Sequence, residues 1–415
     1  MKKILIAIGI LCLAVIVVVA CTGLGGRNEG EIVTVTPTPE ATPTDPPAET
    51  EETGETAGTD AEQPAAGVDY EAIYALHEPD EVVMTVGGKD VRWKDHYYLL
   101  YSQAAEMEQQ FLMYQYYGYA LGWNSQADDE GHTYAELLPE AVENTLCQLS
   151  AIESLAEETG IALSPEQEAE LQDMHQKNIA YYCGETATEE DFFAYLDTMH
   201  LSPELYWRLS RANELYEACF LQIYGENGEL LDEEEALAQL EADGVVSADH
   251  ILIATLDLDT REALDEATVA EKTALAQQIA EELLAIEDPE ARLARFAELK
   301  EQYNEDPGAV EGYVFGEGVM VQEFYDGTLA LEPGEVSAPI KSAYGYHIIL
   351  RRPVDLDMSV TGGSGTTGRL TAALSLFNAR LDARMDEAKA SVAPVGDFQV
   401  PNILDFYTKP EPVDK

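Results

Sequence analysis

The sequence predicts an α+β protein with two folded parts, one mainly helical and one in which helices surround a small sheet. Three observations support this. Apolar residues recur at helical spacing in the first part, and a β-α-α-β order of segments follows from Val245 onwards. The chain of 415 residues, 46% of them hydrophobic, is also too long for one ordinary domain and can bury more than one core.

The first 21 residues are typical of an export signal. Two lysines are followed by an apolar stretch at 4–19 and by Ala20 directly before Cys21. This pattern resembles a bacterial lipoprotein signal, which implies cleavage before Cys21, lipid attachment to its thiol and an extracytoplasmic, membrane-anchored protein. The alternative is an uncleaved membrane-spanning helix, for which the apolar stretch is near the short limit.

Residues 22–67 are predicted to be a disordered tether. The segment is rich in Pro, Thr, Glu, Gly and Ala, so it cannot bury enough apolar surface to offset the entropy cost of ordering. Its prolines and like charges favour an extended chain. We expect it to hold the folded parts clear of the membrane.

The charge of the chain excludes some classes of partner. Its 79 acidic and 23 basic residues give a formal net charge of -56, which argues against nucleic acid and against electrostatic attachment to anionic lipid. Such a surface could attract basic clients or cations, and a solvated acidic surface explains it equally well. The sequence leaves the oligomeric state open, a dimer included.

Cysteine usage indicates neither a disulfide framework nor a metal site. Cys12 lies in the signal and Cys21 is the lipidation candidate. The remaining three, Cys147, Cys183 and Cys219, are an odd number with wide spacing. We interpret them as small core residues, with one disulfide pair left open, and we expect no metal and no cofactor.

The helical part, residues 68–244, is predicted to begin with a short strand and turn. Gly87 and Gly88 interrupt the strand-like run EVVMTVGGKDV, and helices follow. A capping box begins at Ser164, and Ser202 before a proline gives a second helix start. Apolar residues at helical spacing mark a further helix: Leu138, Val142, Leu146, Leu149, Ile152 and Leu155.

Aromatic and Met side chains are dense in this part, most of all in QQFLMYQYYGYALGW at 109–123. Such side chains offer a large apolar area with a polar handle, which suits loose binding of unfolded chains. We expect most of them to form helix core and some to be exposed as a client-binding surface.

The second part, residues 245–353, is predicted to be a compact α+β unit. VSADHILIA at 246–254 is strand-like, and YGYHIIL at 344–350 is the last strand. Amphipathic helices are expected at Thr268–Ile286 and Pro289–Tyr303, with short Gly-punctuated strand segments after them.

The last part, residues 354–415, is predicted to return to the helical part. A flexible linker at 361–368 precedes apolar residues at helical spacing between Leu370 and Ala388. Since this helix has no neighbour of its own, we expect it to pack on the helical part, which would make the α+β unit an insert.

Two of the seven histidines, His250 and His347, lie in the strand-like runs of the second part. An imidazole in a buried strand must find hydrogen-bond partners or lower its pKa and stay neutral. Both could be structural residues with satisfied hydrogen bonds, or both could work in a site.

Four runs follow one another within 246–353: ADHILI, FAELKEQYNEDPG, GYVFGEGVMVQEF and ALEPGEVSAPIKSAYGYHIIL. Together they resemble a parvulin-type peptidyl-prolyl isomerase domain. The layout of signal, tether, helical region, parvulin unit and returning helix resembles the PrsA-type and SurA-type foldases. The resemblance implies a small antiparallel sheet with surrounding helices. It also implies isomerisation of Xaa-Pro bonds in unfolded or partly folded exported proteins.

The resemblance further implies roles for single residues. It assigns the buried catalytic network to His250, Asp306, His347 and Ser342. It assigns substrate contacts to Met320, Phe324, Tyr344, Tyr313 and Phe315. Asp306 would either shape the electrostatics at the twisting amide or orient a histidine.

Two departures from the family pattern are visible. An apolar wall residue, usually Leu, is replaced by Gly312 or Tyr313, which implies a more open pocket and lower activity. A non-catalytic holdase with an inactive or weak parvulin module therefore stays an alternative. The loop TLDLDTRE is acidic and would repel phosphate, so specificity for phosphoserine-proline is disfavoured.

Overall fold

The computed structural model describes residues 67–308, 312–362 and 365–408. The predicted signal, Cys21 and nearly all of the predicted tether lie outside these residues. Among the helices of the described ranges, none is long and apolar enough to cross a membrane. The described residues divide into two compact units: 67–151, 163–214 and 385–408 form the first, and 152–162, 215–308, 312–362 and 365–384 form the second.

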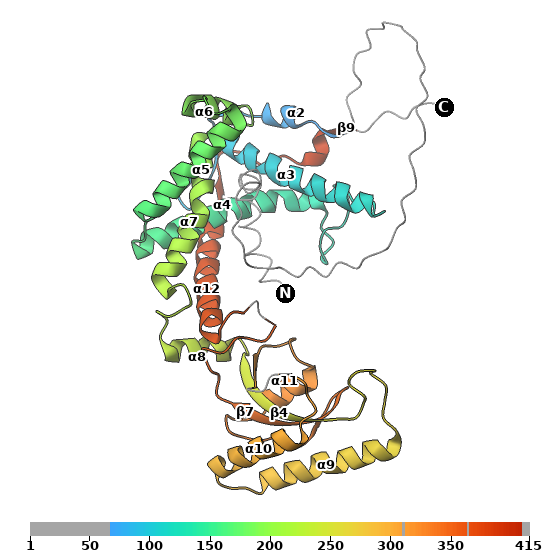
Figure 1. Cartoon of the computed structure of the whole chain (residues 1–415). Coiled ribbons are helices and arrows are strands. Elements are labelled where there is room, and N and C mark those ends of the chain that lie inside the picture. The colour runs from blue at the N-terminus through green and yellow to red at the C-terminus, as the bar shows by residue number, and fades with distance from the viewer. Residues whose placement is uncertain (1–66, 309–311, 363–364, 409–415) are drawn as a thin grey trace, which may run out of the picture. The chain divides into compact units, whose positions relative to one another are not determined.

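The first unit is mainly helical (Figure 1). It contains α2 (Tyr70–Tyr74), α3 (Trp93–Tyr116), α5 (Pro165–Cys183), α6 (Glu189–Asp197) and most of α4 (Tyr134–Thr159), as well as the first half of α7 (Pro203–Tyr224). Helix α5 begins at the predicted capping box, where the Gln167 N–H donates to Ser164 Oγ and the Ser164 N–H donates to Gln167 Oε1. The six apolar residues predicted for α4 are all buried.

Short strands from both ends of the described chain pair in the first unit. Strand β2 (Val82–Val86) pairs with β3 (Lys89–Arg92) across the predicted Gly87-Gly88 turn, and both glycines have positive φ. The other edge of β2 pairs with β8 (Ala393–Pro394). Strands β1 (Gly67–Val68) and β9 (Tyr407–Thr408) form a separate pair. The 3-10 helix η1 (Ile403–Phe406) directly precedes β9.

The second unit is built on a four-stranded antiparallel sheet of order β5-β4-β7-β6. Its strands are β4 (Val246–Ala254), β5 (Tyr313–Phe315), β6 (Ile340–Lys341) and β7 (Gly345–Arg352). In the β4–β7 ladder, His250 lies opposite Ile349 and His347 lies opposite Leu252. Because side chains alternate between the faces of a strand, His250 and His347 are diagonal neighbours on one face of the sheet.

The two faces of this sheet are covered by different helices. Ile251 and Ile348 point to the face that packs on α9 (Glu266–Leu284) and α10 (Pro289–Tyr303). On the opposite face, Ala248 and Ile349 pack with Phe324 of α11 (Gln322–Leu329). The histidines share this second face, so they lie between the sheet and α11. The unit also contains α8 (Glu233–Ala242), the ends of α4 and α7, and most of α12 (Gly368–Ala390), which is the predicted C-terminal helix.

Helix α11 lies where strand segments were expected, so that local prediction was wrong. Helix α8 lies within the part predicted to be helical, although no helix had been assigned to its residues. Most aromatic side chains of the helical part are buried or half-buried, as expected, but in the run 109–123 most large apolar side chains are exposed, with Phe111 and Trp123 as the buried exceptions. Cys183 is only half-buried, and it, Cys147 and Cys219 are all free thiols, so the disulfide left open is not formed.

Candidate active site

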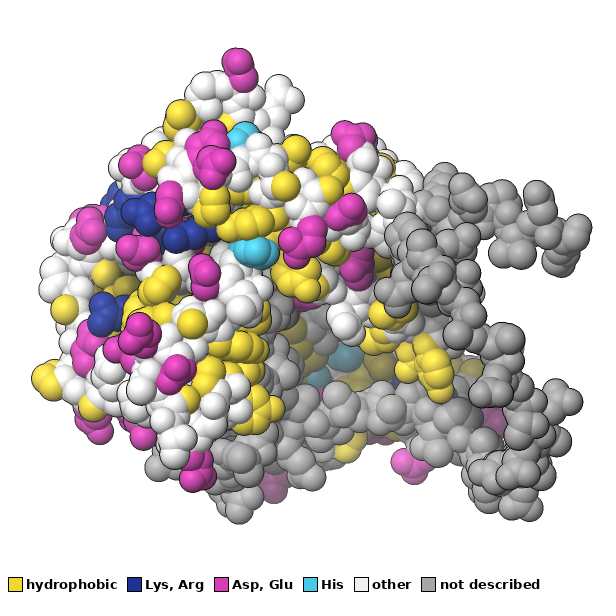
Figure 2. Space-filling view, turned by 90° about the horizontal axis from the view of Figure 1, so that it is seen from above, with side chains coloured by type: hydrophobic (Ala, Val, Ile, Leu, Met, Phe, Trp, Pro, Cys, Tyr) yellow, Lys and Arg dark blue, Asp and Glu magenta, His cyan; other side chains and the backbone are white. Residues whose placement is uncertain are grey.

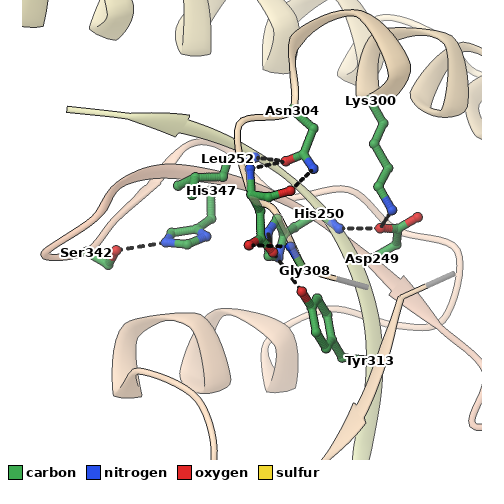
Figure 3. A network of polar contacts seen from close by, with 10 residues as sticks. Asp249, His250, Leu252, Lys300, Asn304, Gly308, Tyr313, Ser342 and His347 are labelled. Atoms are coloured by element: carbon green, nitrogen blue, oxygen red, sulfur yellow. Dashed lines mark hydrogen bonds and ion pairs between the residues drawn. The ribbon is translucent and has the colours of Figure 1, made fainter. Parts of the chain in front are cut away.

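The two histidines lie next to each other in a network of polar contacts in the second unit (Figure 3). The centroids of the His250 and His347 rings are 5.2 Å apart, and the rings are nearly perpendicular at 87°. Both side chains are buried, as is Ser342. Gly345 allows β7 to lie this close to β4, because a Cβ at this position would lie 2.2 Å from the carbonyl oxygen of Ile253 on β4.

Each histidine has one hydrogen-bonded partner on its Nε2 atom. Nε2 of His250 lies 3.1 Å from Oδ2 of Asp306, and Nε2 of His347 lies 2.7 Å from Oγ of Ser342. The Nδ1 atoms of both rings are buried without a hydrogen-bond partner among the described residues. The four predicted network residues are therefore brought together, as two hydrogen-bonded pairs that touch through the rings.

The contact with Asp306 fixes the protonated nitrogen of one ring. The Asp306 carboxylate only accepts hydrogen bonds, so Nε2 of His250 is the nitrogen that carries the proton. Ser342 Oγ accepts a hydrogen bond from the Tyr344 N–H at 3.1 Å and also lies within hydrogen-bond distance of Nε2 of His347.

The pKa values of His347 and Asp306 are both lowered in the site. Burial lowers the pKa of His347 from its ordinary value of 6.5 to about 4, the nearby His250 acts in the same direction, and Asp306 opposes both. His347 is therefore neutral at pH 7. The hydrogen bond with His250 holds the pKa of Asp306 well below its usual range; burial acts against this, and bonds from Tyr313 and the Gly308 N–H support it.

The loop that carries Asp306 is fastened to β4. The Leu252 N–H donates to Oδ1 of Asn304 at 2.8 Å, and Nδ2 of Asn304 donates to the Asp306 carbonyl oxygen at 3.1 Å. The Gly308 N–H donates to Oδ1 of Asp306 at 3.1 Å. Of the two roles expected for Asp306, this geometry favours orientation of His250.

Tyr313, one of the two residues expected at the position of the apolar wall residue, contacts the polar network. Its hydroxyl donates to Oδ2 of Asp306 at 2.7 Å, and its ring is stacked on His250 with centroids 5.8 Å apart. The preceding Gly312 has φ +95°, and a Cβ there would lie 3.0 Å from the carbonyl oxygen of Ala248. The close approach at Gly312 brings the Tyr313 phenol over the site, so this side is covered by a side chain.

The apolar floor of the site is aromatic. Phe324 contacts His250 and His347 with ring centroids 4.9 Å and 5.3 Å away, and it is only 2% exposed. Met320 is half-buried against the same cluster. Phe315 is fully buried and packs against Phe324, so it supports that ring and is not itself exposed to a substrate.

Tyr344 lies at the edge of the site with a partner that the sequence did not reveal. It is half-buried, and Arg261 donates a hydrogen bond of 3.3 Å to its hydroxyl while lying 5.2 Å from its ring centroid. Arg261 comes from the loop TLDLDTRE, whose composition indicated only negative charge. The single arginine of that loop was the only sequence feature from which this contact with Tyr344 could have been predicted.

Comparison with known proteins identifies this unit. Residues 250–352 match the family model described as the Rotamase, PPIC-type PPIase domain. Foldase protein PrsA 4 of Bacillus cereus is 48% identical over 83 residues, which are 19% of this chain and 26% of that protein. Foldase protein PrsA of Halalkalibacterium halodurans is 36% identical over 118 residues, which are 28% of this chain and 34% of that protein. The chain thus matches only about a quarter to a third of the length of these relatives.

Solved structures of PrsA are less similar over a longer stretch. The crystal structure of peptidylprolyl isomerase (PrsA) from Bacillus cereus has 20% identity, covers 68% of this chain and 98% of that chain, and has a TM-score of 0.26. PrsA from Bacillus subtilis has 18% identity, covers 65% and 93%, and has a TM-score of 0.20. We therefore base the family on the sequence match alone: residues 250–352 form a parvulin-type (PPIC-type) peptidyl-prolyl isomerase domain, related to that of the PrsA foldases.

Proposed function

We propose that the protein catalyses cis-trans isomerisation of Xaa-Pro bonds in unfolded or partly folded exported proteins. The observation that carries this proposal is the placement of His250 and His347 on one sheet face, each with its polar partner, against the ring of Phe324. Met320, at the border of the same cluster, is suited to contact the proline ring.

The chemistry that such a site must supply is modest. The prolyl amide crosses a barrier of about 18–20 kcal/mol unaided, and no bond is made or cut during the rotation. A turnover time near a millisecond needs an acceleration on the order of 10⁴, or about 5–6 kcal/mol. Neither a nucleophile nor a metal is needed for this step.

The residues of the site can provide this stabilisation by polarity and shape. Twisting the amide removes its resonance, so the carbonyl loses charge and the twisted form is less polar than either planar form. A neutral His347 and the Phe324 ring form an apolar wall that favours the twisted form. Asp306 keeps its charge beside Nε2 of His250, where it fixes the orientation of that ring.

A peptide assay tests catalysis directly. The intact protein should accelerate isomerisation of a short Xaa-Pro tetrapeptide, and Met320→Ala should lower kcat/KM by about tenfold through lost contact with the proline ring. His250→Ala should lower it further, because it also releases Asp306. Leu293→Ala, at an exposed position of α10, is the matched control. A wild-type rate equal to the spontaneous rate would exclude catalysis.

A holdase is the second candidate. It is favoured by the near-complete burial of Phe324 and by the Tyr313 phenol over His250, both of which restrict access in this conformation. A holdase would suppress aggregation of an unfolded client while leaving the peptide isomerisation rate unchanged.

We also propose that the protein acts outside the cytoplasmic membrane, anchored by lipid on Cys21. The support is the signal-like sequence at 1–21 and the acidic, Pro-rich segment after it. Labelling of cells with a fatty-acid analogue should mark the wild type and leave Cys21→Ala unlabelled. Labelling of that variant to the same extent would refute the anchor.

A further inference from the structure

The end of α3 and the turn after it carry large apolar side chains that are 41–86% exposed. We refer to residues 112–119 as the aromatic tip. Its exposed side chains are Leu112, Met113, Tyr114, Tyr116, Tyr117 and Tyr119. An exposed apolar cluster of this density is unusual on a protein surface and typically marks a binding site.

The aromatic tip has a fixed backbone. The N–H groups of Gly118 and Tyr119 donate to the carbonyl oxygens of Gln115 and Tyr114 at 2.9 Å and 3.0 Å, which closes the end of α3. The rings of Tyr114 and Tyr119 contact each other with centroids 6.2 Å apart. The side chains are therefore presented to solvent by an ordered turn, and they contact one another.

The surroundings of the aromatic tip are acidic. Residues 95–176 contain sixteen Asp and Glu and no Lys or Arg. Glu108 accepts a hydrogen bond of 3.2 Å from the Trp123 indole on the buried side of the tip. The loop after Trp123 carries Asp128, Asp129 and Glu130 and returns to Tyr134, whose ring packs on Phe111 of α3. Figure 2 shows one face of the molecule, on which acidic side chains are scattered among hydrophobic ones while most of the Lys and Arg side chains lie on one side.

We propose that the aromatic tip is a docking surface for extended client segments that combine Lys or Arg with apolar side chains. Tyrosine rings bind both kinds of group, because apolar chains pack on them and cations lie over their faces. The nearby carboxylates add attraction for the same segments and repel acidic ones. This inference rests on the proposed foldase role and assigns its class of client.

Charge argues against two other occupants. The segment 22–66 contains ten acidic residues and one basic residue, so it is repelled by an acidic surface. A second copy of the chain would bring the same acidic residues to the interface. A cationic, partly apolar polypeptide is the occupant that complements both the rings and the charges.

The test is a binding titration of the full chain by fluorescence anisotropy. The ligands are two unstructured peptides that carry Tyr and Leu at the same positions. The cationic peptide has Lys and Arg between these positions, and the acidic peptide has Glu there. The cationic peptide should bind at least about tenfold more tightly than the acidic one, and high salt should reduce the difference. The triple variant Tyr116→Ser, Tyr117→Ser, Tyr119→Ser should weaken binding of the cationic peptide by about tenfold.

The matched control is Tyr181→Ser, which removes a similarly exposed tyrosine from α5. Unchanged affinity in the triple variant, or equal affinity for both peptides, would overturn the proposal. A dimer in sedimentation experiments that the triple variant abolishes would also overturn it, in favour of self-association. Tetrapeptide isomerisation is an independent readout: it should be unchanged in the triple variant, and its absence in the wild type would count against catalysis alone.

Discussion

Tyr313 donates a hydrogen bond of 2.7 Å to Oδ2 of Asp306, the same oxygen atom that contacts Nε2 of His250 at 3.1 Å. One carboxylate oxygen thus joins a phenol and an imidazole whose rings are stacked. Tyr313 is one of the two residues, with Gly312, that stand where the family pattern led us to expect an apolar wall residue. The departure therefore adds a polar contact to the site, in addition to changing the shape of its wall.

Tyr313→Phe should raise the pKa of Asp306, because the hydrogen bond from Tyr313 stabilises the carboxylate. Asp306 would then gain a proton at a higher pH, so the acid limb of the kcat/KM profile should move to higher pH. We expect the plateau rate to fall by about threefold to tenfold as His250 loses its fixed partner. Tyr325→Phe, which removes a hydroxyl that donates to the Gly244 carbonyl oxygen, is the control. An unmoved acid limb with an unchanged plateau would show that the phenol has no role.

Phe324→Ala should separate packing from catalysis. The ring is 2% exposed and contacts both histidines and Phe315, so its removal leaves a cavity and should destabilise the second unit by about 3–5 kcal/mol. Met320 is half-buried, and Met320→Ala should cost less than half of that. Urea unfolding followed by circular dichroism measures both. Equal stability of the two variants would contradict the packing described for α11.

His96 should make the first unit sensitive to acid. Burial lowers its pKa from 6.5 to about 4, His77 adds to this, and neither ring nitrogen has a hydrogen-bond partner among the described residues. The unfolded chain binds a proton near pH 6.5 and the folded chain only near pH 4, so stability should fall as pH drops through this window. The loss is at most about 3 kcal/mol.

His96→Leu removes this proton-binding group without removing a hydrogen bond. The variant should lose less stability than the wild type between pH 7 and pH 4.5. Tryptophan fluorescence follows the first unit selectively, because Trp93, Trp123 and Trp207 all belong to it. Identical pH dependence of the two proteins in urea titrations would exclude His96 as the cause.

Deletion of residues from Arg369 onward should destabilise the first unit. The end of the chain supplies β8 to the sheet of β2, and Ser391 Oγ accepts a hydrogen bond of 2.7 Å from the Gly87 N–H. If the parvulin unit is an insert, as predicted, an isolated 245–353 fragment should still fold, as judged by circular dichroism. Equal melting of the tryptophan signal with and without the C-terminal segment would refute this arrangement.

The sequence predicted those features that depend on local pattern. Alternation along 246–254 placed a strand there, and the capping box at Ser164 located the start of α5. The short α11 was missed because it has only eight residues and contains Gly327, which weakens the helical pattern. The sequence predicted that some aromatic side chains of the helical part are exposed, but it could not predict that these gather at the aromatic tip, since a run of apolar residues in a helix ordinarily packs into a core.

The site was predictable in its composition and only partly in its contacts. The family pattern named His250, His347, Asp306 and Ser342, and the structure brings all four together. The bond from Tyr313 depends on how closely Gly312 approaches β4, a three-dimensional relationship that no local pattern encodes.

Refolding of a client protein limited by a slow prolyl isomerisation tests the central claim most directly. The wild-type protein at substoichiometric concentration should increase the rate constant of the slow phase, and Met320→Ala should reduce that increase by about tenfold. The contrary result is a slow phase that keeps its spontaneous rate while aggregation of the client is suppressed, which would make the protein a holdase.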